Sequence, residues 1–358
     1  MGKVASLALR MFEFTRDYRY HFLQKQIAKG LLHSIEQERG KTERHLIRLC
    51  DGYAIDVFGH PMFAPWLYVY AAVAGEFREG WIPDNYYAKT VVPAIKGGYG
   101  EVSFLKPLTG KLFNSDYFPD MGAYVNGIWV SKSNEVLKPE QLSEYFFSQS
   151  TRIVFKLDNS LQGKGIHFFT RETFSPAELE RLGNGVVQSC IVQHPFFDEI
   201  VRGAVATLRI TTVILNSGEC SLRACHLRIG RKSETHVQSA SQLLVTVDPT
   251  TGELSSVAFM SNWKTVNCHP DTAFVFGAQK IPFFDECVRV VKKLHLQVPF
   301  VRAVGWDVVV DCNNQVKVME WNGAHNGIKF SEATQGPCFA DLGWESLWKK
   351  RNEMHPEN

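Results

Sequence analysis

The segment at residues 305–322 constrains the fold more than any other part of this chain, because its pattern predicts a β-hairpin. A β-branched run follows Asp307, a turn-forming Asp-Cys-Asn-Asn sequence lies at 311–314, and a second apolar run leads to Glu320. Pairing of the two strands brings Asp307 close to Glu320, with Asn322 two residues further along on the same face. Two carboxylates and an amide oxygen form a hard-oxygen donor set that suits Mg²⁺. Because Mg²⁺ held by few protein ligands usually binds phosphates as well, the hairpin predicts nucleotide chemistry.

A lysine and a glycine-containing loop form a second motif, about 150 residues before the hairpin. Lys156 ends a predicted strand at 152–156, and a loop with Gly163 and Gly165 leads to a returning strand at 166–169. Glycine lets backbone N–H groups approach phosphate oxygens, and the lysine supplies a point charge. The loop is not a Walker A motif, because no Gly-Lys-Ser or Gly-Lys-Thr sequence opens a helix after it.

Each motif also has a simpler interpretation when it is taken alone. Asp307 and Glu320 are then solvated carboxylates at strand ends, and the lysine loop is a flexible hairpin with exposed charges. The two motifs are independent of each other, and both indicate phosphate and Mg²⁺ binding. Their joint occurrence therefore favours a nucleotide site over the two simpler interpretations.

Composition places the chain among ordinary globular proteins. It has 358 residues, of which 45% are hydrophobic and 21% charged, and this length suits two or three subdomains. The net charge of +2 gives no general argument for binding nucleic acid. Eight cysteines occur without CxxC spacing, which predicts reduced thiols in a cytoplasmic protein.

The first fifty residues are distinctly basic. They hold ten Lys and Arg against five acids, a net charge of +5, and apolar residues recur among them at helical spacing. The arginines interrupt any apolar core of a signal peptide. A basic amphipathic helix of this kind either packs on its own domain or lies on an anionic membrane face or a partner protein. The second alternative implies a peripheral location at the inner membrane face.

The alternation of predicted strands and helices indicates an α+β protein. An Asn-Gly turn predicts a hairpin at 125–130, and Lys138-Pro139 predicts the start of a helix. The other predicted strands lie at 186–192, 205–215, 221–229 and 243–247, with a helix at 283–295. Residues 1–50 are predicted to be helical with breaks at Gly30 and Gly40.

The order of these motifs resembles the ATP-grasp superfamily, and several further segments resemble its sugar-transfer-associated branch. Those segments are His269-Pro270-Asp271-Thr272, Gln193-His194-Pro195, residues 207–212, Gly305-Trp306-Asp307 and Gln335. The resemblance covers roughly residues 85–345. It implies the ATP-grasp fold, in which two α+β subdomains grip ATP behind an N-terminal α/β domain. The expected division is an N-terminal helical and pre-ATP-grasp domain at 1–100, a first subdomain at 101–187 and a second at 188–358.

On this resemblance, several side chains would hold the phosphates of ATP. Lys156 would contact the α- and β-phosphates. The loop that closes over the β- and γ-phosphates would contain Ser160, Gly163, Lys164 and Gly165. The first nucleotide lysine would be Lys111, with Lys106 as a competing candidate a short step upstream.

The resemblance also implies where the base, the ribose and two Mg²⁺ ions would lie. The hinge whose backbone reads the adenine edge would contain Gln188, Ser189, Cys190 and Ile191. Since no acid stands in this stretch, Asp198 or Glu199 would contact the ribose. Asp307 would hold one Mg²⁺, Glu320 would bridge two ions, and Asn322 would complete the second.

Two arginines are the candidate catalytic residues. Arg209 lies in the middle of a predicted strand, where an arginine is costly if it is buried without an anion. The alternative is an exposed sheet face. The resemblance implies that Arg209 contacts the γ-phosphate or an acyl phosphate, with Arg228 on the next strand as second candidate. His226 is either a base for an amine or a structural histidine, and Asn326 and Lys329 are candidates for the acceptor site.

The resemblance implies an ADP-forming carboxylate–amine ligase that acts through an acyl phosphate. The expected setting is cell-surface (capsular) polysaccharide biosynthesis, with a uronic acid or related sugar and an amino acid or amine as substrates. The alternatives are a phosphotransferase acting on a sugar or small molecule, and a nucleotide-binding regulator without turnover. Retention of Asp307, Glu320, Asn322 and Lys156 argues against the regulator.

Overall fold

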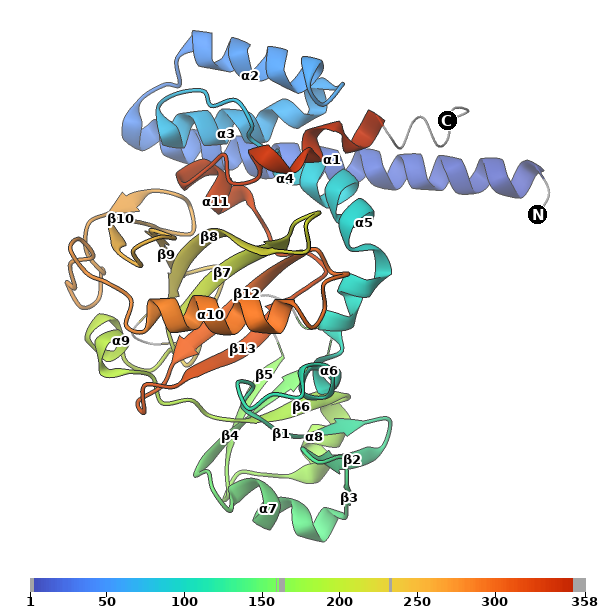
Figure 1. Ribbon diagram of the computed structural model, residues 1–358, viewed down its shortest axis with the longest axis vertical. Helices are drawn as coiled ribbons and strands as arrows, with labels where there is room; N and C mark the ends of the chain where they lie inside the picture. Colours follow the sequence, from blue (N-terminus) through green and yellow to red (C-terminus); the bar gives the residue numbers. More distant parts are fainter. Residues whose placement is uncertain (1–2, 159, 161–164, 232–233, 350–358) are drawn as a thin grey trace. The chain divides into compact units, whose positions relative to one another are not determined.

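The computed structural model describes residues 3–158, 160, 165–231 and 234–349, with side chains described from residue 15 onward (Figure 1). Gly163 and Lys164 of the predicted phosphate loop lie outside the described residues. The chain forms two compact units. Unit 1 comprises Met1–Ala94, Asn262–Lys264 and Gly327–Asn358, and unit 2 comprises Ile95–Ser261 and Thr265–Asn326.

Unit 1 is helical in its described residues. Its main helices are α1 (Lys3–Arg39), α2 (Arg44–Asp56), α3 (Ala64–Ala74), α4 (Asp84–Tyr86) and α11 (Lys329–Thr334), with short helical turns η1 (Pro61–Phe63), η2 (Tyr87–Val91), η5 (Ala340–Leu342) and η6 (Trp344–Ser346). Helix α3 consists almost entirely of apolar residues and is mostly buried, because α1, α2 and α11 all pack against it. None of the helices in the described ranges is long and apolar enough to cross a bilayer.

Two antiparallel sheets form the framework of unit 2. The six-stranded sheet has the order β3-β2-β1-β6-β4-β5. Its strands are β1 (Asp120–Val125), β2 (Ile128–Ser131), β3 (Val136–Leu137), β4 (Arg152–Leu157), β5 (Ile166–Thr170) and β6 (Gly185–Ser189). Helices α7 (Pro139–Phe147) and α8 (Pro176–Leu182) supply Phe146 and Leu179 to the core of this sheet.

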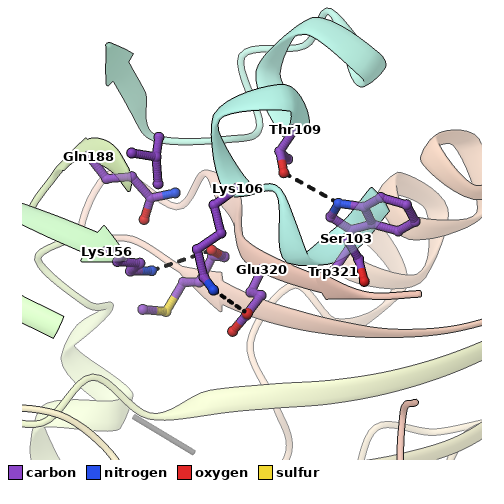
Figure 2. A pocket seen from close by; sticks show the side chains of 9 residues that line it. Ser103, Lys106, Thr109, Lys156, Gln188, Glu320 and Trp321 are labelled. Atoms are coloured by element: carbon purple, nitrogen blue, oxygen red, sulfur yellow. Dashed lines mark hydrogen bonds and ion pairs between the residues drawn. The ribbon is translucent and has the colours of Figure 1, made fainter. Parts of the chain in front are cut away.

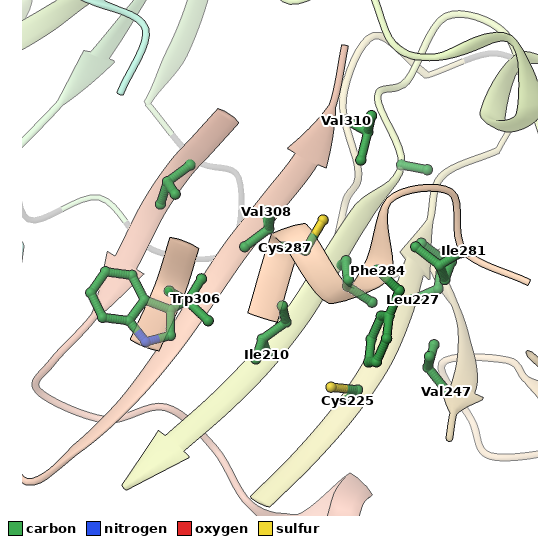
Figure 3. Packing of buried hydrophobic residues seen from close by; sticks show 14 of the residues in the cluster. Ile210, Cys225, Leu227, Val247, Ile281, Phe284, Cys287, Trp306, Val308 and Val310 are labelled. Carbon is green, nitrogen blue, oxygen red and sulfur yellow. The ribbon is translucent and has the colours of Figure 1, made fainter. Parts of the chain in front are cut away.

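The seven-stranded sheet has the order β11-β10-β9-β8-β7-β12-β13. Its strands are β7 (Thr207–Ile214), β8 (Cys220–Ile229), β9 (Leu243–Val247), β10 (Leu254–Phe259), β11 (Thr265–Val266), β12 (Ala303–Val310) and β13 (Val316–Asn322). Helix α10 (Phe284–His295) crosses one face, where Phe284 and Cys287 pack with Ile210 and Val308 (Figures 1 and 3). Alternate strand residues point to opposite faces, so the sheet has an apolar side under α10 and a polar side opposite.

Short helical segments connect the two units and cross unit 2. They are α5 (Val92–Ile95), η3 (Gly97–Phe104), η4 (Lys106–Leu108) and α6 (Thr109–Phe113), and α9 (Pro195–Ile200) follows the six-stranded sheet. This compact helical run was not predicted, although it carries residues of the site described below.

The α+β class is confirmed, and most predicted elements occur at or near their expected positions. The Asn126-Gly127 hairpin forms as predicted, with both residues at positive φ, as a tight two-residue turn requires. The predicted helix at 283–295 is α10.

Three expectations differ from the structure. Gly30 does not end the first helix, which continues to Arg39, because packing on α3 outweighs the modest cost of one glycine. The described residues before Asp120 contain no strand, so the N-terminal part is helical rather than α/β. The described residues 327–349, which were expected in the second subdomain, group with unit 1, because α11 packs on α3.

Candidate active site

The predicted hairpin forms from β12 and β13. Asp307 pairs with Glu320 and Gly305 pairs with Asn322 across the two strands. The Asn322 side chain donates its amide N–H to the carbonyl oxygen of Gly305 at 3.1 Å, so this bond uses the amide nitrogen and not the oxygen. The two predicted acidic ligands and the amide ligand therefore lie on adjacent strands, as the sequence indicated.

Asp307 is buried and held by both candidate arginines. Arg209, its partner across β7 and β12, donates from Nε to Oδ1 at 2.6 Å and from Nη2 to Oδ2 at 3.1 Å. Arg228 on β8 donates from Nη1 to Oδ2 at 3.3 Å. Burial disfavours the carboxylate, but the charges of Arg209 and Arg228 outweigh burial and hold the pKa of Asp307 below its ordinary value. Both oxygens already accept hydrogen bonds, so a cation at Asp307 requires the arginines to share or release them.

The backbone at Gly305 permits this arrangement. A Cβ atom there would lie 2.8 Å from Cβ of Asn326 and 3.3 Å from Cδ of Arg209. Arg209 also donates from Nη1 to the carbonyl oxygen of Asn326 at 3.1 Å. Glycine at this position therefore lets the arginine and the segment after β13 approach the sheet closely.

A small pocket lies between the six-stranded sheet and β13 (Figure 2). It is lined by Ser103, Lys106, Thr109, Lys156, Val186, Gln188, Met319, Glu320 and Trp321. The Nζ atom of Lys156 donates to the carbonyl oxygen of Met319 at 3.4 Å, and Nζ of Lys106 lies 3.6 Å from Oε1 of Glu320. Lys106 thus pairs with one carboxylate of the predicted metal set, and Lys156 bonds the backbone of the residue before it.

The two candidates for the first nucleotide lysine lie in different surroundings. Lys106 is buried, and its Nζ donates to the carbonyl oxygen of Ser160 at 3.2 Å and to its Oγ at 3.3 Å. Lys111 on α6 is exposed and does not line the pocket. Lys106 therefore lies with Lys156 and Ser160, whereas Lys111 does not. Gly165, at the end of the loop, has a positive φ of 73°.

Burial dominates the electrostatics of Lys156. It lowers the pKa of Lys156 although Glu320 and Asp120 lie nearby and favour the charged form. An anion at this place would compensate the burial of the charge, since a buried lysine is stabilised by an opposite charge within a few ångströms.

The predicted hinge lies at the end of β6 and directly after it. Gln188 on β6 lines the pocket and donates from Nε2 to Oδ1 of Asp120 at 2.7 Å. The backbone N–H groups of Ser189 and Cys190 donate to the carbonyl oxygens of Pro119 and Arg152, at 3.0 and 3.3 Å. These two N–H groups are thus engaged within the protein.

Ile191, predicted for the hinge, and Asp198, predicted for the ribose, are not among the residues that line the pocket. Ile191 is half-buried just after β6. Asp198 on α9 accepts a hydrogen bond from Nε2 of Gln193 at 2.9 Å, which gives this carboxylate a structural partner.

Several site residues escaped the sequence analysis. Asp120 is half-buried beside Gln188, and desolvation raises its pKa despite that hydrogen bond and the charge of Lys156. Lys96 is also buried, donates from Nζ to Oδ1 of Asn326 at 2.8 Å, and has its pKa lowered by burial to about 7. Neither residue lies in a recognisable motif, and only the folded chain brings them to this region.

The donor set suits Mg²⁺ bound with a nucleotide. Among the described residues no three His, Cys, Asp or Glu side chains cluster as a metal site. The predicted set has only two acids, Asp307 and Glu320, and its third member, Asn322, contributes an amide. Mg²⁺ needs only a few hard-oxygen ligands from the protein when phosphate oxygens complete its coordination. The two lysines beside this set would bind the same phosphates.

One family model matches part of the chain. Residues 175–341, just under half of the chain, match the family model described as sugar-transfer associated ATP-grasp. The chain carries an ATP-grasp domain. The matched range contains Arg209, Arg228, Asp307, Glu320 and Asn322, whereas Lys106 and Lys156 precede it. No curated protein sequence matches the chain.

Similar solved structures are distant from this ATP-grasp chain. D-alanyl-alanine synthetase A from Vibrio cholerae is 12% identical, with a TM-score of 0.42 over 71% of this chain and 67% of that one. The ATP-grasp ligase PsnB with its minimal precursor is 10% identical, with a TM-score of 0.39 over 72% and 64%. The ADP complex of N5-carboxyaminoimidazole ribonucleotide synthetase is 12% identical, with a TM-score of 0.36 over 61% and 44%. The chain spans less than two thirds of the length of the last two structures.

Proposed function

We propose that the chain is an ADP-forming carboxylate–amine ligase that activates a carboxylate as an acyl phosphate. The observation that carries the proposal is the convergence of Lys106, Lys156 and Glu320 in one pocket, with Asp307 opposite Glu320 on the adjacent strand. Two buried cations beside a hard-oxygen set favour the β- and γ-phosphates of ATP as the ligand. The proposed substrates are a uronic acid or related sugar and an amino acid or amine, in line with the family's description as sugar-transfer associated.

In the proposed reaction the substrate carboxylate attacks the γ-phosphorus and ADP leaves. The amine then attacks the acyl carbon, and inorganic phosphate leaves as the amide forms. Lys106 and Lys156 would bind the phosphates already present in the ground state. Asp307, Glu320 and Asn322 would hold Mg²⁺, which neutralises charge on the transferred phosphoryl group.

Arg209 and Arg228 are proposed to stabilise the charge that moves during transfer. They hold Asp307 from two neighbouring strands, so the arginines and the carboxylate can exchange partners when a phosphate and a cation arrive. His226 lies opposite Arg209 on β8 and is buried. Burial and the two arginine charges lower its pKa well below the ordinary value, so the imidazole stays neutral and is a weak base. This favours the structural alternative for His226 over a role as the base for an incoming amine.

Product analysis tests the proposal. The chain is incubated with MgATP, candidate uronic acids and an amine pool, and the products are identified by mass spectrometry. We expect ADP and phosphate in equal amounts, and a hydroxamate when hydroxylamine replaces the amine. AMP would instead indicate adenylation, and a phosphorylated sugar without phosphate release would move the assignment to a phosphotransferase. Glu320→Ala is the inactive control and Glu253→Ala, at an exposed glutamate outside the pocket, is the matched active control.

A further inference from the structure

Helix α1 exposes a broad face that mixes basic and apolar side chains. Within residues 15–30 the exposed large apolar residues are Tyr18 (63% exposed), Phe22 (50%), Leu23 (51%) and Ile27 (45%). The exposed basic residues in the same stretch are Arg16, Arg19, Lys25 and Lys29. The opposite side of the helix carries the buried Ala28 and Ile35. Apolar residues therefore occur on both sides of this helix, but only those on one side are buried against the rest of the protein.

The exposed residues fall into two adjoining stripes. Tyr18, Phe22, Lys25 and Lys29 follow one line along the helix, and Arg16, Arg19, Leu23 and Ile27 follow another, at spacings of three and four residues. The two stripes together occupy about half of the helix circumference, at 100° per residue. In Figure 1 the N-terminal part of α1 runs past α2 and α3.

The exposed charged residues of α1 within residues 15–30 are all basic. The only acid in residues 15–30 is Asp17, which lies on the inner side and pairs with Nζ of Lys89 at 2.6 Å. The four basic residues consequently give the exposed face a uniformly positive potential. A second copy of the same face would meet like charge. Its apolar residues form two pairs, Tyr18 with Phe22 and Leu23 with Ile27, rather than the single seam of a coiled coil.

We propose that this face of α1 binds the surface of an anionic lipid bilayer. Aromatic and aliphatic side chains enter the headgroup region, while lysine and arginine side chains extend their charged ends to the lipid phosphates. Nucleic acid would satisfy the basic residues but would leave Leu23 and Ile27 without an apolar partner. A bilayer interface offers negative charge and apolar depth together. The contact with the bilayer is shallow, because Arg19 and Gln26 separate Tyr18 and Phe22 from Leu23 and Ile27 around the helix.

Vesicle co-sedimentation of the full chain tests this proposal, using phosphatidylcholine vesicles with and without phosphatidylglycerol. We expect binding to the anionic vesicles that weakens with salt, and little binding to the neutral ones. Lys25→Gln with Lys29→Gln should lower the partition coefficient roughly 25-fold, because each basic side chain near an anionic surface contributes a factor of about five. Phe22→Ser with Ile27→Ser should also weaken binding but leave its salt dependence intact.

The matched control is Lys138→Gln with Lys293→Gln, which changes the net charge equally at exposed lysines of unit 2 and should bind like the parent. Circular dichroism checks that every variant is folded. Equal binding to neutral and anionic vesicles, or an α1 charge variant that binds like the parent, would overturn the proposal. Sedimentation velocity showing a dimer that the α1 variants lose would assign the face to self-association. Stronger binding to single-stranded RNA than to anionic vesicles would likewise reject the lipid assignment.

Discussion

Each unit of this chain buries a carboxylate, and the two carboxylates are satisfied in different ways. In unit 1, Glu332 on α11 accepts hydrogen bonds from the backbone N–H groups of Ile82 and Cys338, both at 2.8 Å. In unit 2, Asp307 accepts from the side chains of Arg209 and Arg228. Burial raises the pKa of Glu332 to about 7 although those N–H groups favour the ionised form, whereas the arginines hold the pKa of Asp307 below its ordinary value.

The difference distinguishes a structural carboxylate from one suited to chemistry. Backbone donors cannot leave Glu332 without unfolding the segments that carry them, so its bonds tie distant parts of unit 1 together. Arginine side chains can rotate away from Asp307 and find other anions, so its bonds are exchangeable. We therefore expect changes near Asp307 to affect turnover and changes at Glu332 to affect folding.

The largest effect is expected for Glu320→Ala, which should lower turnover by about a hundredfold or more, because it removes a proposed metal bridge. Its side chain is about one third exposed and only 3.6 Å from Lys106, so the free energy of unfolding should change little. Steady-state rates and denaturant unfolding measure the two quantities. Glu253→Ala serves as control. Turnover within a few-fold of the parent would contradict the site assignment.

Glu332→Gln should lower the free energy of unfolding by about 1–3 kcal/mol, because one of two buried backbone donors loses its acceptor. Nucleotide affinity of the folded protein should stay unchanged, since every residue lining the pocket belongs to unit 2. Denaturant unfolding and titration calorimetry with a non-hydrolysable ATP analogue check this. Exposed Glu79 supplies the control Glu79→Gln. A Glu332→Gln variant as stable as the parent would contradict the structural role assigned to Glu332.

The two candidate lysines offer a sharper test within unit 2. Lys106→Met should weaken nucleotide binding about tenfold, because one charge-assisted phosphate contact is lost. Lys111→Met, at an exposed position five residues later, should change the affinity less than about twofold. The same calorimetric titration measures both variants. A larger loss for Lys111→Met would return the role to the lysine that the sequence favoured.

Within one pH unit, the effect of pH on stability is the smallest of the expected effects. Burial lowers the pKa of Lys96 to about 7, so between about pH 7 and 10.5 the unfolded state holds a proton that the folded state lacks. Stability should therefore rise with pH in this window, by about 1 kcal/mol between pH 7 and 8, and be independent of this lysine below it. Glu332 has the opposite sign, since its raised pKa makes stability fall between about pH 4.5 and 7.

Lys96→Met separates these two contributions. In denaturant unfolding the variant should lose most of the rise above pH 7 and keep the fall at lower pH. Exposed Lys138 supplies the control Lys138→Met, which should leave both slopes unchanged. If Lys96→Met follows the parent curve throughout, Lys96 titrates normally and its burial costs nothing.

Much of the architecture could be predicted from local sequence, because hairpins and amphipathic helices depend on near neighbours. The pairing of Asp307 with Glu320 followed from a short turn and two apolar strands, and the Asn126-Gly127 hairpin followed from its turn residues. The ATP-grasp resemblance also depended on ordered local motifs. The N-terminal part was harder to predict, because α1 packs on α3 and so continues past Gly30.

Sequence by itself determined the chemistry available to this protein. It supplied two lysine candidates, a hairpin with hard-oxygen ligands, and two arginines within strands. Only the tertiary structure decided how these groups combine. Arg209 and Asp307 are 98 residues apart and meet because β7 pairs with β12 in the seven-stranded sheet. Lys106 rather than Lys111 enters the pocket because a helical turn directs one of them inward. Such choices depend on strand order and on contacts between distant segments, which local propensities do not encode.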